Sequence, residues 1–410
     1  MRSWLTIFLI CLFGETFAGT IVVGSNKTFK SLGAAIRAAK SGDTILLHKG
    51  VYREGNLIIS KPLYLIGVDA PVLDGELKTE LLTLTGKNIL VTGIHFNNAG
   101  YSSMNDFAAI KIIDAQQITI AGNTISNASF AIHVANSVHS IIRNNTIRGN
   151  NKSEHSSGNG IHLWKCDNMQ IRNNTIGGHR DGIYLEFVTH STMSGNISEK
   201  NIRYGLHFMF SHDNAYLSNT FKNNGAGVAV MYTRNVRMEN NVFEKNWGAS
   251  AYGILLKDIT DSHIINNTFL QNTVGIHMEG SSRIDIKNNI FQENGWAIKV
   301  QASCDDNAFY HNNFYGNSFD IATNGSAVLN RFYENYWDKY EGYDRNKDGK
   351  GDIPYHPVSM YAMIIEQNPN ALILLRSFMV TLLDRAEKAI PSLTPVHLVD
   401  ESPMIKPIKR

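Results

Sequence analysis

Side chains that can bind metals or partners recur at a fixed spacing in the middle of the chain. A pair such as Gly-Ile or Gly-Leu returns about every 22 residues and opens a short run in which apolar residues alternate with more varied ones. The residue after each pair reads, repeat by repeat, His133, His162, Tyr184, His207, Ala229, Leu255, His277, Lys299. Two residues later the chain reads Ala135, Trp164, Glu186, Met209, Met231, Lys257, Glu279, Gln301. Thioether and imidazole groups suit copper, Cu(I) in particular.

If each run is a strand, the varied residues share its outer face, and equivalent residues of successive repeats lie about 4.8 Å apart. A patch rich in methionine and aromatic side chains on such a face is typical of a contact surface. Three interpretations stay open at this point: a partner-protein surface, a copper site, or simple packing of stacked side chains. The candidate residues are His162, Trp164, Tyr184, Glu186, His207, Met209, Phe210, Met231 and Tyr232.

The elements that position this patch follow from a second repeat. An Asn-x-Ile or Asn-x-Phe anchor recurs at steps near 22, and the chain contains 43 Asn. Short β-branched runs with no helix between them at this period predict one coil of a parallel β-helix per repeat. Buried Asn side chains at the corners would then bond to one another from coil to coil. Two of the intervals between Asn anchors are longer than 22 residues. The extra residues fall within 148–159 and 246–252, beside the predicted strand that carries the candidate patch.

The predicted fold class is therefore all-β: a right-handed parallel β-helix, a pectate-lyase-like solenoid of roughly a dozen coils. It is expected to occupy residues 19–330. Residues 28–40 are amphipathic and predict a helix that covers the first coil, with Thr28 as its N-cap.

Composition excludes several other classes of protein. Charged residues make up 18% and hydrophobic residues 43% of the chain, which is too apolar for a disordered chain. A net charge of +2 argues against a nucleic-acid partner. Cys166 and Cys304 are expected six coils apart, too far for a disulfide.

Residues 1–18 predict a secretory signal peptide. Arg2 supplies the positive start, residues 5–13 are an apolar stretch, and cleavage is expected near Ala18. Nine apolar residues are too few to span a bilayer, so we expect an exported protein without a transmembrane helix after cleavage.

A β-helix also raises the possibility of a carbohydrate-binding protein, or of one that cleaves or epimerises carbohydrates. Such enzymes need clustered carboxylates, or a set of Asp and Arg side chains, at one place. The best candidates are Asp181 and the pair Asp305 and Asp306, which are expected about six coils apart. The sequence therefore favours a protein that is not an enzyme, with a polysaccharide lyase or epimerase as the alternative.

The C-terminal part differs in character from the repeat. Residues 331–357 contain oxygen ligands at alternate positions followed by Gly, as in the first half of an EF-hand loop, but without its final Glu. The alternatives are a calcium site and a metal-free turn; the candidate calcium ligands are Asp344, Asn346, Asp348 and Asp352. Residues 358–410 predict helices and a Pro-punctuated tail. Their apolar residues, expected to dock on a membrane partner, are Leu372, Leu374, Leu375, Phe378 and Leu382.

Several strings resemble the NosD family: Arg180–Glu186 (RDGIYLE), Tyr204–Asn214 (YGLHFMFSHDN), Gly225–Tyr232 (GAGVAVMY), Leu375–Ser377 (LRS) and Leu393–Val396 (LTPV). The resemblance covers nearly the whole mature chain. It implies a periplasmic accessory factor for maturation of the copper enzyme nitrous oxide reductase.

Further expectations come with this resemblance. The implied partners are the ATPase and permease of an ABC-type transporter, a copper-chaperone lipoprotein and the reductase itself, with membrane association through the permease. The implied cargo is copper, with sulfur as a second candidate. Because no Cys-rich or His-rich tract marks a storage site, only transient copper contact is expected.

Overall fold

The computed structural model describes residues 18–102, 106–150, 154, 157–325, 329–375, 377–390 and 398–409. The predicted signal peptide, apart from Ala18, lies outside the described residues. So do Arg376 and the string Leu393–Val396.

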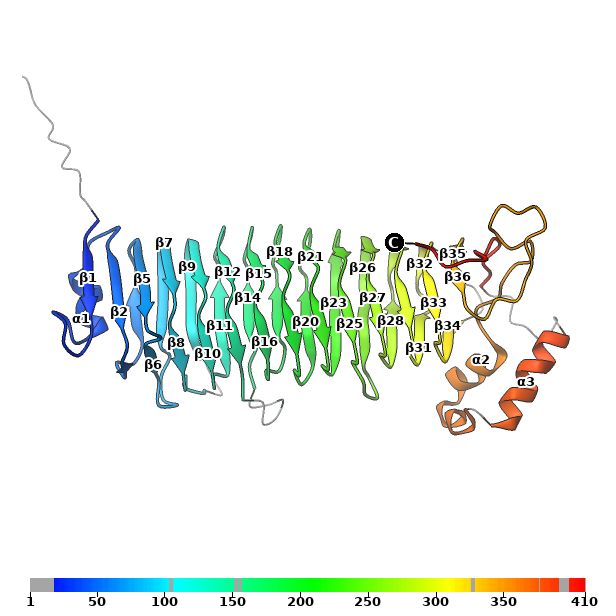
Figure 1. Cartoon of the computed structure of the whole chain (residues 1–410), viewed down its shortest axis with the longest axis horizontal. Helices are drawn as coiled ribbons and strands as arrows, with labels where there is room; N and C mark the ends of the chain where they lie inside the picture. The colour runs from blue at the N-terminus through cyan, green and yellow to red at the C-terminus, as the bar shows by residue number, and fades with distance from the viewer. Residues whose placement is uncertain are drawn as a thin grey trace, which may run out of the picture.

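The chain winds into an elongated parallel β-helix, which confirms the predicted fold class (Figure 1). One of its two sheets has 13 strands, one per coil. These strands are β3 (Val51–Tyr52), β6 (Val72–Asp74), β8 (His95–Asn97), β10 (Thr124–Ser126), β13 (Thr146–Arg148), β16 (Thr175–Gly177), β19 (Ile197–Glu199), β22 (Thr220–Lys222), β25 (Val242–Glu244), β27 (Thr268–Leu270), β30 (Ile290–Gln292), β33 (Asn313–Tyr315) and β36 (Tyr336–Trp337).

The second sheet has 23 strands that form two parallel columns. One column carries the candidate patch: β4 (Leu57–Ile59), β11 (Phe130–Ala135), β14 (Ile161–Trp164), β17 (Ile183–Glu186), β20 (Tyr204–Met209), β23 (Ala226–Arg234), β28 (Val274–Glu279), β31 (Trp296–Val300) and β34 (Phe319–Ala322). The other column holds β1 (Thr20–Val23), β2 (Thr44–His48), β5 (Leu63–Val68), β12 (Ile141–Arg143), β15 (Gln170–Arg172), β18 (Thr192–Ser194), β21 (Ala215–Leu217), β24 (Arg237–Glu239), β29 (Ser282–Lys287), β32 (Asp305–Tyr310) and β35 (Leu329–Tyr333). The long strands β7 (Leu82–Thr92), β9 (Ala108–Ala121) and β26 (Tyr252–Ile265) belong to both columns.

A ladder of buried asparagines runs along one corner, as the repeat predicts. From Asn123 to Asn312, the backbone N–H and the side-chain amide of each Asn donate to Oδ1 of the Asn one coil further on. From Asn145 to Asn174 these distances are 3.0 and 2.9 Å. The members of the ladder are Asn123, Asn145, Asn174, Asn196, Asn219, Asn241, Asn267, Asn289, Asn312 and Asn335. Because every member satisfies turn groups that have no strand partner, the ladder fixes the register of all the coils it joins.

Apolar side chains fill the inside of the coils. Aromatic rings stack from coil to coil with centroids between 4.0 and 5.5 Å apart, in the order Phe221, Phe243, Phe269, Phe291, Phe314, Trp337. This core gives the rod a stiff scaffold on which an outer face can hold side chains in line.

The N-terminal end is covered by helix α1 (Leu32–Ala38), so the predicted covering helix is present but shorter than expected. Ser31, and not Thr28, is its N-cap, because its side chain accepts from the Ala34 N–H. The Glu54 carboxylate accepts from the N–H groups of Leu32 and Gly33, which supplies partners for two other donors of the first turn.

The C-terminal end is covered by the tail. The last strand ends at Trp337, beyond the expected boundary at residue 330. Helix α2 (Met360–Gln367), the 3₁₀ helix η1 (Pro369–Leu374) and α3 (Phe378–Ala389) form a group beside the last coils (Figure 1). The chain then returns to bridge Phe332 with Asp400 and Tyr336 with Met404. None of the helices in the described part of the chain is long and apolar enough to cross a membrane.

Candidate functional site

The column of histidines predicted from the repeat is present in register. His133 pairs with His162, His162 with Tyr184, and Tyr184 with His207 on successive strands. Their ring centroids lie 4.8, 4.8 and 4.9 Å apart, so four rings form one continuous stack. Parallel in-register pairing of β11, β14, β17 and β20 is what holds these rings in line.

The histidines are less accessible than their outward register predicts. The exposed fraction is 9% for His162 and 6% for His207. The expectation that both face solvent is therefore wrong. The physical reason is a second column of side chains, each three residues before a member of the first column on the same strand. The Phe130 ring stacks on His162 with centroids 5.7 Å apart, and the Tyr204 and His207 centroids are 4.8 Å apart.

Several buried polar atoms of this region have no hydrogen-bond partner. They include both ring nitrogens of His162 and of His207, Nδ1 of His133, Nε of Arg180 and Oδ2 of Asp181. Burial lowers the pKa of His162 to about 3, with smaller contributions from His133 and Arg180. The imidazole of His162 is therefore neutral at physiological pH, which leaves a lone pair free for a ligand.

Asp106 joins the first two histidines of the column. One ligand atom from each of Asp106, His133 and His162 lies within 4.8 Å of the other two. Among the described residues, no other set of three His, Cys, Asp or Glu side chains comes together in this way. Asp106 could not be predicted from the repeat, because it lies in the loop before β9 and outside the repeated spacing.

His162 and His207 cannot share one metal ion, because the Tyr184 ring lies between them. Two steps of about 4.8 Å separate their strands, whereas ligand atoms around one copper ion lie about 2 Å from the metal. The predicted patch therefore divides into an imidazole end near His133 and His162 and a second part beyond Tyr184.

The second part carries the methionines. Glu186, Met209 and Met231 pair in register on β17, β20 and β23, as predicted, and all three are partly exposed. Trp164 precedes them in the same column, with the Lys165 ammonium 4.3 Å from its ring centroid. Thioethers on neighbouring strands with partial access to solvent can contact a soft metal ion or an apolar partner.

An exposed aromatic strip borders the methionines. Phe187, Phe210 and Tyr232 stack with centroids 5.4 and 5.1 Å apart and are 45%, 39% and 37% exposed. All three adopt left-handed backbone conformations, with φ of 54°, 49° and 54°. That conformation is costly for bulky residues, and the other coils place Asn136, Lys165, Asp258 or Gly280 at this turn. The strip is thus kept at the expense of local stability. Phe187 was not among the predicted patch residues.

The best carboxylate candidate for catalysis stands beside two arginines and a histidine. Asp181 is 1% exposed, and its Oδ atoms lie 3.6 Å from His207 Nδ1, 3.8 Å from Arg180 Nε and 4.0 Å from Arg203 Nε. Hydrolysis of glycosides needs two carboxyl groups that flank one bond. Asp305 and Asp306 lie on β32, several coils away. The predicted separation of these acids therefore holds in the structure.

The candidate calcium loop is closed by its own hydrogen bonds. Asp344 accepts from the N–H groups of Asp348 and Gly349, and Asp352 accepts from the Arg345 N–H. The Asn346 side chain donates to Asp348 at 3.0 Å. The carboxylates of Asp344, Asp348 and Asp352 do not form a ligand group of the kind found at Asp106. These hydrogen bonds fix the shape of the turn, and calcium binding by the four residues stays a prediction.

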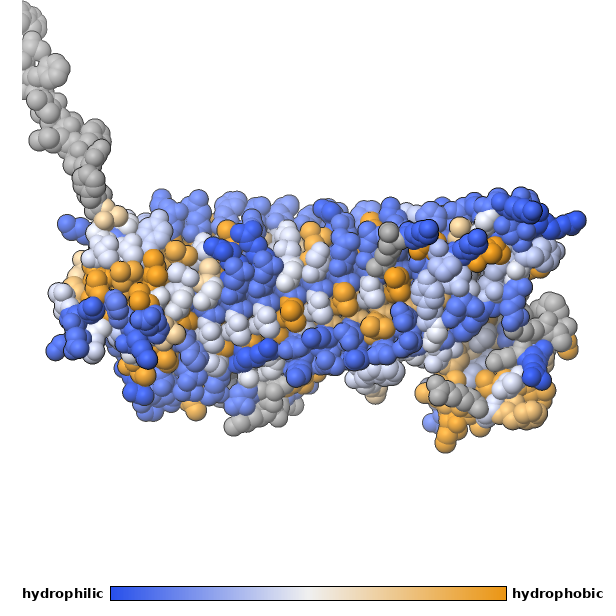
Figure 2. Space-filling view, in the orientation of Figure 1, coloured by the Kyte–Doolittle hydropathy of each residue, from blue (hydrophilic) through white to orange (hydrophobic). Residues whose placement is uncertain are grey.

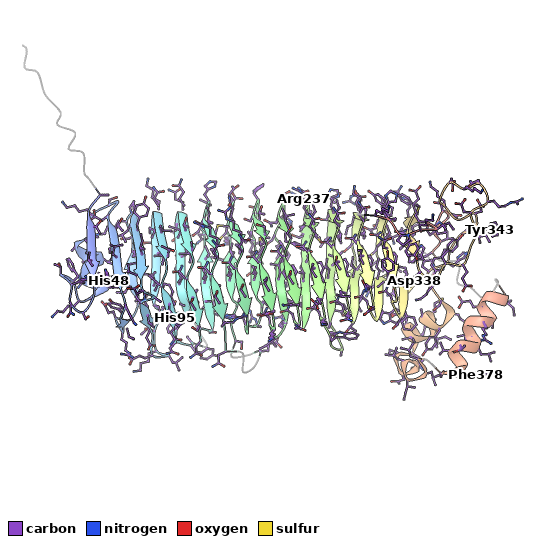
Figure 3. All side chains as sticks on the ribbon, in the orientation of Figure 1. His48, His95, Arg237, Asp338, Tyr343 and Phe378 are labelled. Atoms are coloured by element: carbon purple, nitrogen blue, oxygen red, sulfur yellow. The ribbon has the colours of Figure 1, made fainter. Side chains whose placement is uncertain are left out.

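The C-terminal helices present apolar side chains to solvent (Figure 2). The exposed set is Leu372, Ile373, Leu374, Phe378, Met379, Leu382 and Ile390, whereas Leu375 is partly buried against Phe319 and its neighbours. Phe378 alone is 78% exposed, and Figure 3 places it on α3 at the opposite end of the molecule from His48. An exposed apolar patch of this kind marks an interaction site.

Comparison with known proteins identifies the family. Residues 144–342 match the family model described as "Periplasmic copper-binding protein (NosD)". The match includes the strands that carry His162, Tyr184, His207, Met209 and Met231. The chain belongs to the NosD family. The resemblance read from the sequence strings is confirmed.

Two relatives with the NosD name support this result. "Probable ABC transporter binding protein NosD" of Pseudomonas aeruginosa is 28% identical over 428 residues, which cover 86% of this chain and 86% of the relative. The protein of the same name from Stutzerimonas stutzeri is 30% identical over 112 residues, which cover 27% of this chain and 26% of the relative.

Solved structures share the β-helix of this NosD-family chain. The catalytic unit of a GH87 α-1,3-glucanase from Streptomyces thermodiastaticus has a TM-score of 0.59 at 13% identity and covers 75% of this chain and 65% of the other. An alginate lyase from Paenibacillus has a TM-score of 0.52 at 20% identity and covers 61% and 94%. At these identities the likeness concerns the fold, and function has to be argued from the site.

Proposed function

We propose that this chain is a periplasmic, non-catalytic subunit of an ABC-type transporter complex that matures the copper centre of nitrous oxide reductase. Its β-helix face receives a copper carrier, with sulfur as a second candidate cargo. The patch from His162 to Tyr232 contacts the cargo or its carrier, and the C-terminal helices dock on the permease. Family membership and the two relatives that carry an ABC transporter name support the general role.

One observation carries the partner surface: three exposed aromatic rings are held in left-handed turns beside Met209 and Met231. A turn that served only the scaffold needs no aromatic residue there, since the equivalent turns of other coils carry Asn136, Lys165, Asp258 and Gly280. The strip adds apolar contact area, and the two thioethers add soft ligands at its edge. An apolar strip next to two thioethers suits transient binding of a copper carrier protein to this face of the β-helix.

The copper-binding description of the family and the ABC transporter name of its relatives favour the non-catalytic role over the carbohydrate alternative. Asp181 pairs with Arg180 and Arg203, and Arg203 pairs with Glu154 at 3.5 Å, which is the kind of acid and arginine set that the alternative would use. Stacked aromatic rings can also bind sugars, so binding of a uronate polymer by the purified protein would favour the alternative.

The test replaces both Met209 and Met231 with Leu, which keeps volume and removes the sulfur ligands. We expect the reductase matured with this variant to lose most of its copper, measured by metal analysis and by its visible spectrum. The matched control replaces Met238 and Met278, which point into the core, with Leu. Full copper loading with the Met209 and Met231 variant would contradict the proposal.

A further inference from the structure

The group formed by Asp106, His133 and His162 stands apart from the methionine surface. His133 and His162 are held side by side by the pairing of β11 with β14, and Asp106 reaches them from the loop before β9. Asp106 is exposed, His133 is half-buried and His162 is buried, so the group runs from solvent to the interior. Met209 lies two coils further on, about 10 Å along the rod.

Imidazole nitrogens of this group have no hydrogen-bond partner, which favours a bound ligand. Nδ1 and Nε2 of His162 and Nδ1 of His133 are buried without a hydrogen-bond partner. Each such atom costs about 1–3 kcal/mol when it is left unsatisfied, and native proteins keep few of them. Phe130 stacks over His162 and limits the access of water. A metal ion bound by one nitrogen of each ring would supply a partner for the lone pair of each imidazole.

The surroundings are suited to a cation. The rings of His133 and His162 lie 4.8 Å apart on neighbouring strands, and a carboxylate oxygen of Asp106 lies within 4.8 Å of a ring nitrogen of each. Lys111, which also faces His133, is 2.7 Å from the Glu80 carboxylate, so its charge is balanced. Arg180 faces His162 from the next coil and lies 3.8 Å from Asp181. Asp106 supplies the negative charge at the site itself.

We propose that Asp106, His133 and His162 form a site that binds Cu²⁺. Two imidazole nitrogens and a carboxylate oxygen are a ligand set that binds Cu²⁺ more tightly than the other divalent ions of the first transition series. The thioethers of Met209 and Met231 are softer and suit Cu(I). The choice of copper rests on the proposed function. On this basis one face holds two distinct copper environments, one hard and one soft.

The experiment is a titration of purified, metal-free protein with Cu²⁺, followed by electron paramagnetic resonance. We expect one ion per chain and nitrogen hyperfine coupling from two imidazoles. His133→Gln and His162→Gln should each raise the Kd for Cu²⁺ by at least about 100-fold, since loss of even an outer-sphere partner lowers metal affinity about 10–100-fold. Asp106→Asn should weaken it less. His277→Gln is the matched control, because His277 occupies the same column position beyond the methionines.

Unchanged affinity and an unchanged spectrum in both histidine variants would overturn the site. If a variant fails to fold, pulsed measurements on the unmodified protein still count the coordinated imidazoles, and a count other than two would overturn it. Tighter binding of Zn²⁺ than of Cu²⁺ would overturn the assignment to copper. These results are independent of reductase loading by the Met209 and Met231 variant, so this inference and the proposed function can fail separately.

Discussion

Asp400 ends the asparagine ladder by taking the position of the next Asn after Asn335. The backbone N–H and the side-chain amide of Asn335 donate to Asp400 Oδ2 at 3.0 and 3.1 Å, as each Asn of the ladder does to its successor. The same carboxylate accepts from Trp337 Nε1 and from the Glu334 N–H. A carboxylate only accepts hydrogen bonds, so it satisfies the last donors of the ladder without needing another coil.

We expect Asp400→Ala to lower the free energy of unfolding by roughly 2–5 kcal/mol, because it leaves several buried donors without an acceptor. Asp400→Asn retains one acceptor oxygen and should cost roughly 1 kcal/mol. Denaturant unfolding of both variants measures the difference. Since coils contact only their neighbours, hydrogen exchange should show the loss concentrated around β35 and β36. Equal stability of the Ala variant and the unmodified protein would show that the tail is not a cap.

Phe210→Asn separates stability from partner binding. Asn tolerates the left-handed backbone at φ 49° better than Phe, so the stability of the variant should be unchanged or higher by up to about 1 kcal/mol. Partner binding should weaken by about tenfold or more, because an exposed aromatic anchor is lost. Thermal unfolding and copurification of the copper carrier measure the two effects. Asp258→Asn, at the same turn two coils later, should leave carrier binding unchanged.

Acid should destabilise the metal-free protein from about pH 6.5 downward. Burial lowers the pKa of His162 to about 3 and that of His179 to about 4, from 6.5. The unfolded chain therefore binds protons that the folded chain does not, and stability present above pH 6.5 is lost as the pH falls towards these values. Each histidine should contribute about 2 kcal/mol between pH 6.5 and 5. Unfolding at pH 7 and pH 5 should differ less for His179→Gln; an equal difference would contradict this assignment.

The C-terminal helices should be needed for the membrane partner and not for folding of the rod. Replacing Phe378 and Leu382 with Ser removes exposed apolar side chains, so stability should change by less than about 0.5 kcal/mol. Association with membranes that contain the permease should fall by about tenfold or more, measured by cosedimentation. Ile58→Ser changes a similarly exposed apolar residue at the other end of the rod and serves as the control. Undiminished cosedimentation of the helix variant would argue against docking by this surface.

The scaffold could be predicted from the sequence because its signals are periodic. The spacing of the Asn anchors predicts the length of one coil, and the Gly-Ile runs indicate which residues share a strand face. The columns through His162 and Met209 could therefore be predicted from the sequence, and the strand register confirms them. The turn at Phe210 was found only in part: its aromatic character is visible in the sequence, whereas its left-handed backbone and its contact with Phe187 are not.

The β-helix, the register of its columns and the family resemblance could all be predicted from the amino-acid sequence. The features built by residues outside the repeat became visible only in the folded chain. Phe130 and Tyr204 cover the histidines, Asp106 joins His133 and His162 from a loop, and Asp400 returns from the tail to Asn335. A repeat in the sequence identifies residues that are neighbours one coil apart, because their separation along the chain is constant. A contact that occurs only once, between residues separated by an arbitrary length of chain, leaves no periodic signal in the sequence.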